Sequence, residues 1–128
     1  MTNAEHPALT IMRADTVGSV QSKLKISDLP APMAPEDGKG SFYHLDDLGF
    51  WVFFDENGHV YSLRYDANFP YAIEGIKMGD SRDAVQKARG KRDRLHPVQD
   101  KERWIYDKPR FLRVDFDPKT SRVERIFR

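Results

Sequence analysis

The residue types that most often perform chemistry are present in this sequence, but not in catalytic patterns. None of the four histidines forms H-E-x-x-H or an i, i+4 pair, the spacing that places two imidazoles on one helix face for a metal ion. No serine lies in a G-x-S-x-G motif, and the absence of Cys excludes a thiolate nucleophile or thiolate zinc site. We therefore expect no metal, no cofactor and no enzymatic activity. The histidines are His6, His44, His59 and His96.

Two carboxylate pairs and one glycine-rich segment are accounted for without catalysis. Asp46-Asp47 and Asp55-Glu56 lie where strands are expected to end, and the side-chain hydrogen bonds of turns account for them. The segment Gly38-Lys39-Gly40-Ser41 has the last residues of a phosphate-binding loop without its upstream glycine or a preceding strand. A glycosidase, phosphatase or nucleotide-binding function is therefore not indicated.

A dense basic run, KARGKRDR at residues 87–94, is a candidate phosphate-binding site. Basic residues near the carboxyl end of a helix are also favoured by the helix dipole, and acidic residues interrupt the run. A nucleic-acid-associated domain is accordingly the alternative function. Its candidate residues are Lys87, Arg89, Lys91, Arg92 and Arg94.

Charge is distributed unevenly along the 128 residues, although the net charge is only +1. Residues 1–70 hold 10 acids and 5 bases, a net charge of −5, and residues 71–128 hold 10 acids and 16 bases, a net charge of +6. This asymmetry indicates two surfaces of opposite sign, each attractive to a partner of opposite charge. The length fits one domain. No apolar run is long enough to cross a membrane and no secretory signal is seen, so a cytoplasmic location is expected.

Hydrophobic alternation and turn signals predict a series of short elements. Residues 1–8 and 27–41 are expected to be a frayed end and a loop. Asp80 or Ser81 can cap a helix that Gly90 ends, and Asn57-Gly58 is a strong hairpin signal. Strands are predicted at residues 41–45, 49–55, 60–65, 102–106, 110–116 and 122–127.

A weak internal repeat organises these elements. Residues 15–23 align with residues 80–88 through Asp, a hydroxyl residue, Val and Gln, and residues 52–55 align with residues 114–117. The repeat predicts a duplication of residues 15–65 and 80–127 within a single domain, with residues 15–26 helical. The predicted fold class is α+β: an antiparallel sheet with helices packed on one face, built from two tandem helix-plus-three-strand units.

The repeat also predicts which strand residues face the core. Alternate residues of a strand point to opposite faces, so Val52 and Phe54, with Val114 and Phe116, are expected in the core. Their neighbours Trp51 and Phe53 align with Arg113 and Asp115, which favour a solvated face. Trp51 and Phe53 are therefore expected on an open face of the sheet, where exposed aromatic residues indicate a contact surface.

The second half of the chain resembles a known family of folds. The segments GIKMGDSRDAVQKARG at residues 75–90, ERWIYD, RFLRVDFD and RVERIF resemble the repeated unit of the beta-lactamase-inhibitor-protein-like fold, also found in the small lipoprotein of the outer-membrane assembly machinery. The resemblance covers residues 73–128, and reaches 15–65 through the internal repeat. It implies a sheet that offers an aromatic surface to another protein. The positions that carry it are Gly79, Ser81, Val85, Trp104, Phe116, Val123 and Ile126.

The resemblance and the aromatic residues together predict a non-enzymatic inhibitor. Bacterial toxin-immunity proteins are often small binders of this kind, and we expect this chain to occlude the active site of a cognate toxin. Acidic residues around aromatic ones suit a basic target such as a nuclease toxin. An envelope-assembly scaffold is a further alternative. The predicted partner-binding residues are Tyr43, Asp46, Asp47, Trp51, Phe53, Asp55, Glu56 and Tyr61.

Overall fold

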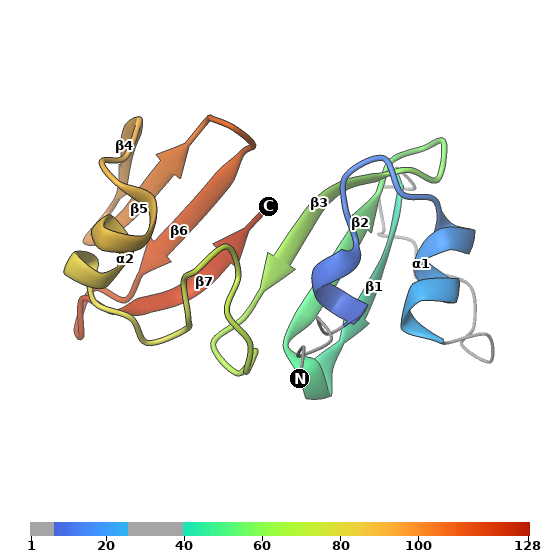
Figure 1. The fold of residues 1–128 in the computed structure, drawn as a ribbon, viewed down its shortest axis with the longest axis horizontal. Coiled ribbons are helices and arrows are strands. Elements are labelled where there is room, and N and C mark those ends of the chain that lie inside the picture. The colour runs from blue at the N-terminus through green and yellow to red at the C-terminus, as the bar shows by residue number, and fades with distance from the viewer. Residues whose placement is uncertain (1–6, 26–39) are drawn as a thin grey trace, which may run out of the picture. The chain divides into compact units, whose positions relative to one another are not determined.

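The computed structural model describes residues 7–25 and 40–128, whose regular structure is mainly β-strand (Figure 1). Seven strands form one antiparallel sheet in the hydrogen-bonded order β1-β2-β3-β7-β6-β5-β4. The strands are β1 (Ser41–Leu45), β2 (Phe50–Phe54), β3 (Val60–Tyr65), β4 (Arg94–Val98), β5 (Lys101–Tyr106), β6 (Leu112–Phe116) and β7 (Val123–Phe127). The helices are α1 (Val17–Leu24) and α2 (Arg82–Arg89), with 3-10 turns η1 (Pro7–Thr10) and η2 (Asp46–Leu48).

Contacts between residues divide the chain into two compact units. The first unit contains residues 1–46 and 50–63, and the second contains residues 47–49 and 64–128. The last two residues of β3 belong to the second unit, where Arg64 pairs with Phe127 and Tyr65 pairs with Ile126 of β7. The second unit therefore contains β4 to β7 and the end of β3.

The predicted fold class is wrong. In the described part of the chain the fold is β-rich, with one seven-stranded antiparallel sheet and two α-helices of eight residues each, rather than two helix-plus-three-strand units. The second unit contains a strand, Arg94–Val98, that is not among the predicted strands. Four of its five residues are exposed and Pro97 interrupts it, so it lacks the apolar alternation that identifies a half-buried strand. No described helix is both long and apolar enough to span a membrane.

Helix α1 is limited to eight residues by a cap at each end. The Thr16 side chain accepts a hydrogen bond from the Ser19 N–H, and the Ser19 hydroxyl accepts one from the Thr16 N–H, which completes a capping box. The helix ends at Lys25, whose φ of 56° is left-handed. Its buried residue Val20 and the Gln21 amide, which donates to the Tyr43 hydroxyl at 2.8 Å, place α1 on the buried face of β1.

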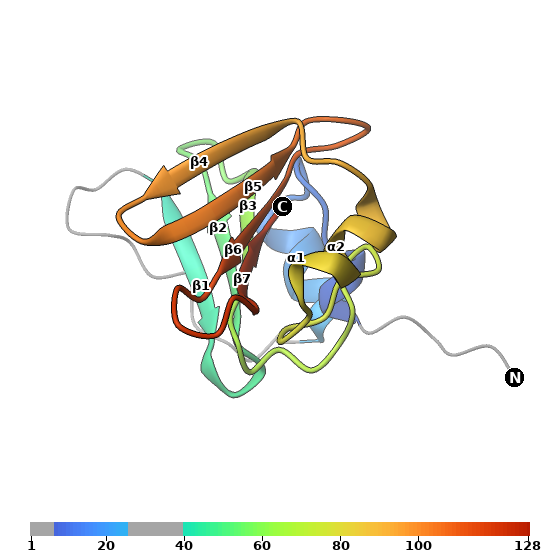
Figure 2. The same cartoon turned by 90° about the vertical axis from the view of Figure 1, so that its left-hand side faces the viewer.

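Helix α2 agrees with its predicted boundaries. The Ser81 hydroxyl accepts a hydrogen bond from the Ala84 N–H, and Gly90 ends the helix with a φ of 80°, which a glycine adopts without strain. Val85 is fully buried. The guanidinium groups of Arg82 and Arg89 lie over the rings of Phe116 and Tyr106, so α2 covers that face of β5 and β6 (Figure 2).

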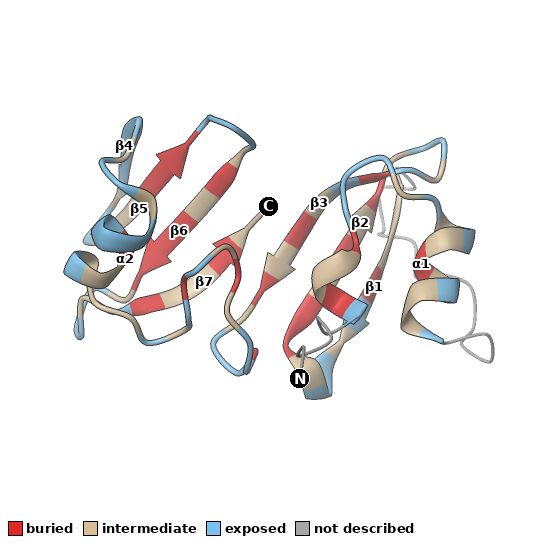
Figure 3. Ribbon diagram, in the orientation of Figure 1, coloured by how far each residue is buried: buried red, intermediate tan, exposed pale blue. Residues whose placement is uncertain are grey.

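The predicted core positions of the two aligned strands are confirmed. Val52, Phe54 and Val114 have no exposed surface, and Phe116 is 1% exposed, which gives β2 and β6 their buried stripes (Figure 3). A further part of the core was not predicted from the sequence. Ile73 and Ile76 are fully buried in a segment without regular structure, where each donates its N–H to the other's carbonyl.

Two expectations about segment ends have different outcomes. The predicted frayed end includes Ala8, which is fully buried within η1, so the first described residues are held in place. The Lys23 ammonium contributes by donating to the Thr10 carbonyl at 2.9 Å. The predicted loop at residues 27–41 lies almost entirely outside the described residues; Ser41 itself begins β1.

The same backbone hydrogen bonds precede both helices. The Val60 N–H donates to the Asp15 carbonyl at 2.8 Å, and the Val123 N–H donates to the Asp80 carbonyl at 2.9 Å. The Asp15 and Asp80 side chains also accept equivalent bonds, from the N–H of the residue three positions earlier in each case. These pairs follow the predicted alignment of the two halves. The duplication itself stays a prediction, supported by this pairing.

The two hairpin turns that follow β2 and β6 are also alike. The Asp55 carboxylate accepts bonds from the N–H groups of Asn57 and His59, and the Asp117 carboxylate accepts them from Lys119 and Thr120. The backbone N–H of His59 holds the pKa of Asp55 below its ordinary value, and that of Lys119 does so for Asp117. Burial raises the pKa of Asp15, but hydrogen bonds from Met12, Lys23 and Ser19 together lower it.

These lowered pKa values predict acid lability. The unfolded carboxylates protonate near pH 3.8 and the folded ones at lower pH, so the unfolded state binds more protons as the pH falls. The stabilisation is complete above pH 3.8 and is lost as the pH falls through the folded values. Denaturant unfolding in a pH series should show this decline. The free energy of unfolding should fall less steeply with pH in the double variant Asp55→Asn with Asp117→Asn. If Glu56→Gln reduced the decline equally, the decline would not come from the lowered pKa values of Asp55 and Asp117.

Candidate functional site

The outward side of the first unit carries a cluster of aromatic rings that we name the aromatic face. In the antiparallel register of β1 and β2, Phe42 pairs with Phe53 and His44 pairs with Trp51. Directly paired residues share a sheet face, so these four side chains lie together on the side opposite the buried residue Val52. Tyr61 of β3 completes the cluster. The aromatic face therefore consists of Phe42, His44, Trp51, Phe53 and Tyr61.

The rings of the aromatic face form a continuous network. The His44 imidazole stacks on Trp51 with a centroid separation of 3.6 Å, and Trp51 stacks on Phe53 at 5.9 Å with an interplanar angle of 8°. Phe42 lies 5.6 Å from Trp51, and Tyr61 lies 6.2 Å from Phe53. Such pairs limit the rotamers of each ring, so the surface is ordered before any partner binds.

The aromatic face retains accessible surface in the structure. Tyr61 is 52% exposed, and Phe42, Trp51 and Phe53 are half-buried. The expectation that Trp51 and Phe53 lie on the face away from the core is confirmed by the burial alternation of β2. Contiguous half-buried aromatic rings on a sheet surface are typical of protein contact sites.

Tyr43 does not belong to the aromatic face. It is only 6% exposed and pairs with Val52, so it points to the core side of β1. Its ring lies 5.8 Å from Phe54, and its hydroxyl accepts a hydrogen bond from Gln21. It occupies the opposite phase of the β1 alternation from the aromatic face, and its predicted role in partner binding stays a prediction. Phe42 and His44, which the sequence analysis did not select, occupy the outward phase.

The predicted acidic residues divide into exposed and structural ones. The Asp46 side chain is 90% exposed and lies 3.5 Å from the His44 Nε2 atom, beside the aromatic face. Asp47 follows it in η2 and is exposed, as is Glu56 in the hairpin turn. Asp55 instead uses its carboxylate to bind the backbone of that turn. Asp55 therefore stabilises the loop between β2 and β3.

The basic run of residues 87–94 is partly engaged by other residues of the protein. Arg94 is the first residue of β4 and makes two hydrogen bonds to the Asp107 carboxylate, at 2.7 and 3.0 Å. The Arg89 guanidinium lies 3.8 Å from Glu74, and that of Arg92 lies over the Trp104 ring at 5.1 Å. Lys87 and Lys91 are exposed. Three of the five residues are thus engaged within the protein.

The outward side of the second unit carries a different surface, which we name the arginine face. In register, Arg103 pairs with Asp115, which pairs with Arg125; in the next row, Arg113 pairs with Phe127, which pairs with Arg64. The arginine face consists of Arg64, Arg103, Arg113 and Arg125. The solvated side of Arg113 was predicted from the sequence, but the cluster was not, because the other arginines come from three separate strands.

Asp115 was expected to be solvated but has no exposed surface. The Arg113 guanidinium donates two hydrogen bonds to the two carboxylate oxygens, each at 2.9 Å, and also lies 3.9 Å over the Phe127 ring. Arg103 approaches the same carboxylate at 3.9 Å. The expectation was wrong because the arginines beside Asp115 cover it, which a single strand pattern does not reveal.

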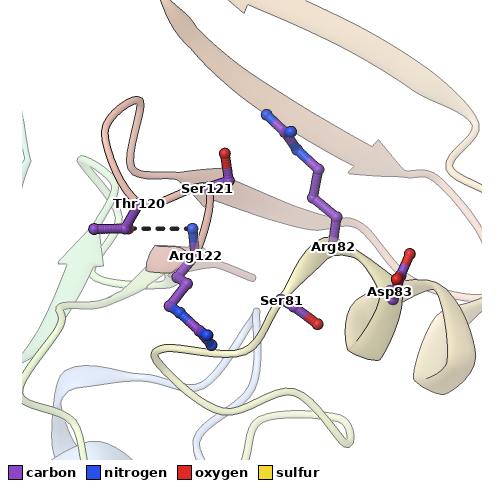
Figure 4. Close-up of a pocket in the computed structure, with 6 residues that line it drawn as sticks. All are labelled: Ser81, Arg82, Asp83, Thr120, Ser121 and Arg122. Carbon is purple, nitrogen blue, oxygen red and sulfur yellow. Dashed lines mark hydrogen bonds between the residues drawn. The ribbon is translucent and has the colours of Figure 1, made fainter.

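A shallow hollow at the start of α2 contains several polar side chains (Figure 4). Ser81 caps the helix, Arg82 pairs with Glu102, and the Thr120 hydroxyl accepts from the Arg122 N–H. The Arg122 guanidinium donates to the Gly79 carbonyl at 2.9 Å. These groups are used in local structure and include no nucleophile paired with a base. Among the described residues, no group of three His, Asp or Glu side chains could hold a metal ion.

Comparisons with known proteins support the fold alone. No protein-family model matches the sequence, and no curated protein matches it. Among solved structures, the chain is similar to a DUF4309 family protein, YjgB, from Bacillus subtilis subsp. subtilis str. 168. The TM-score is 0.58 at 18% sequence identity, and the match covers 88% of this chain and 76% of that chain. The resemblance to the beta-lactamase-inhibitor-protein-like fold stays a prediction.

The burial of Asp115 predicts a large loss of stability when its carboxylate is removed. Asp115→Ala leaves the largely buried Arg113 guanidinium without its partner, which should lower the free energy of unfolding by about 3 kcal/mol. Asp107→Ala, which removes the exposed partner of Arg94, should lower it much less. Urea unfolding of both variants measures the difference. Equal losses would show that Asp115 does not stabilise the arginine face.

Proposed function

We propose that this protein is a non-catalytic binding domain that docks a partner protein on its aromatic face. The observation that carries the proposal is the ordered network of five partly exposed rings on one side of β1 to β3. Large aromatic side chains that become fully buried on association dominate the energy of many interfaces. Trp51 and Phe53, at the centre of the network, are the proposed anchors.

The exposed acids beside the rings favour a basic partner. Asp46 follows β1, and Glu56 lies in the turn after β2, so carboxylates flank strands that carry the rings. A rim of one charge accelerates association with a partner of the opposite charge and disfavours nucleic acid on the same surface. The proposed partner is a basic protein. In the form implied by the resemblance, it is a nuclease-like toxin that the domain inhibits by covering its active site.

The proposal predicts that the anchors matter for binding and not for folding. A partner captured from the native cells is purified, and its affinity is measured by calorimetry against each variant. Trp51→Ala and Phe53→Ala should each weaken binding by about 2 kcal/mol or more. Tyr43→Phe, which changes an aromatic residue on the core side of the same strands, should leave the affinity unchanged. Equal affinities for all variants would contradict docking on the aromatic face.

The two tryptophans allow the contact to be observed directly. Trp104 is 4% exposed and Trp51 is half-buried, so Trp104→Phe leaves a single tryptophan on the aromatic face. Partner binding should shift the Trp51 emission to shorter wavelength and reduce its quenching by iodide, because the ring loses water contact. Stoichiometric binding without either change would place the interface elsewhere. Nucleic acid bound in place of protein, and released by salt, would favour the alternative function.

A further inference from the structure

We infer that the arginine face is a second interaction surface, and that it binds an acidic segment of a protein. The inference concerns the second unit only and is independent of the proposed function of the aromatic face. Four arginines from four strands converge there on two carboxylates, those of Asp66 and Asp115. The cluster therefore carries two positive charges more than its own carboxylates neutralise.

The carboxylates are already engaged by two of the four arginines. Arg113 makes two hydrogen bonds to Asp115, and the Arg64 Nε atom donates to Asp66 at 2.8 Å. Arg103 and Arg125 lie farther away, with Nε atoms 3.9 Å from Asp115 and 3.5 Å from Asp66. Within the described part of the chain, both of these Nε atoms lack a hydrogen-bond partner. Arg103 and Arg125 are therefore the two arginines that make the longer ion pairs with the carboxylates of the cluster.

The depth of the charged groups makes the outer surface positive. Asp115 has no exposed surface, and the Asp66 side chain is 23% exposed. Arg103 and Arg125 keep 25% and 32% of their side chains exposed, and lie on β5 and β7 with one strand between them. Their backbones are thus roughly 10 Å apart. Two carboxylates of one acidic segment can bridge that distance.

The side chains of the arginine face favour an acidic polypeptide over single-stranded nucleic acid. Each guanidinium is planar, remains charged and can donate two parallel hydrogen bonds to a carboxylate or a phosphate. Nucleic-acid-binding sheets usually add exposed rings on which bases stack. The ring on this face, Phe127, is half-buried and covered by Arg113 at 3.9 Å. An acidic polypeptide needs no such ring, so it fits the surface better than single-stranded nucleic acid does.

Binding of poly-L-glutamate to the whole protein tests the inference. Fluorescence anisotropy with the labelled polymer should show saturable binding at low salt. Arg103→Gln combined with Arg125→Gln should weaken this binding about tenfold or more, since two charge-assisted contacts are lost. The matched control is Lys87→Gln combined with Lys91→Gln, which removes the same charge from exposed positions and should have little effect.

A second pair of variants separates the effect of charge from the effect of guanidinium geometry. Arg103→Lys with Arg125→Lys keeps the charge but removes the paired donors, so an intermediate affinity for poly-L-glutamate is expected. Because this change is conservative, it should not disturb the fold. Thermal unfolding of each variant confirms that it is folded. The inference would be overturned by equal losses of affinity in the variant Arg103→Gln with Arg125→Gln and in the control Lys87→Gln with Lys91→Gln. Arginine-dependent binding of a single-stranded oligodeoxynucleotide that is tighter than the binding of poly-L-glutamate would also overturn it, as would no binding of poly-L-glutamate at low salt.

Discussion

The alternation of side chains along a β-strand is the constraint on which both candidate surfaces depend. In each unit a short helix covers one face of the strands, with Val52 and Phe54 buried in the first unit and Val114 and Phe116 in the second. The residues between them must point the other way. At those positions the first unit has Trp51 and Phe53, and the second has Arg113 and Asp115. The same alternation thus presents rings in one unit and ion pairs in the other.

The outward residues are ordered in both units, but by different forces. The aromatic face is held by ring contacts such as the 3.6 Å stacking of His44 on Trp51. The arginine face is held by charge, because Asp115 is buried and must be neutralised by Arg113. Burying an aromatic surface away from water is favourable, whereas a guanidinium surface is stabilised when a complementary charge replaces water. The two surfaces therefore suit partners of different chemistry.

Local patterns predicted the helix after Ser81, most of the strands and the buried stripes, because capping, turn and alternation signals each lie within a few residues. They failed where the outcome depended on residues far apart in sequence. The strand at Arg94 is exposed and gives no alternation, so only its pairing with β5 defines it. Tyr43 and Asp115 were assigned from residue type, and their burial depends on Gln21 and on Arg103 and Arg113. The arginine face draws its residues from four strands, and no sequence window contains it.

The uneven charge of the two halves has a structural counterpart in how each unit uses its carboxylates. Asp15, Asp55 and Asp117 are committed to backbone N–H groups at a helix start and two turns, so their positions in sequence say little about partners. Asp46 and Glu56 are exposed in the first unit, and the partly exposed cations of the second unit include Arg103 and Arg125. Net charge along the chain therefore indicates a binding surface only after the charges used for turns and caps are removed. What is left is a ring cluster with acidic neighbours in one unit and a pair of partly exposed guanidinium groups in the other.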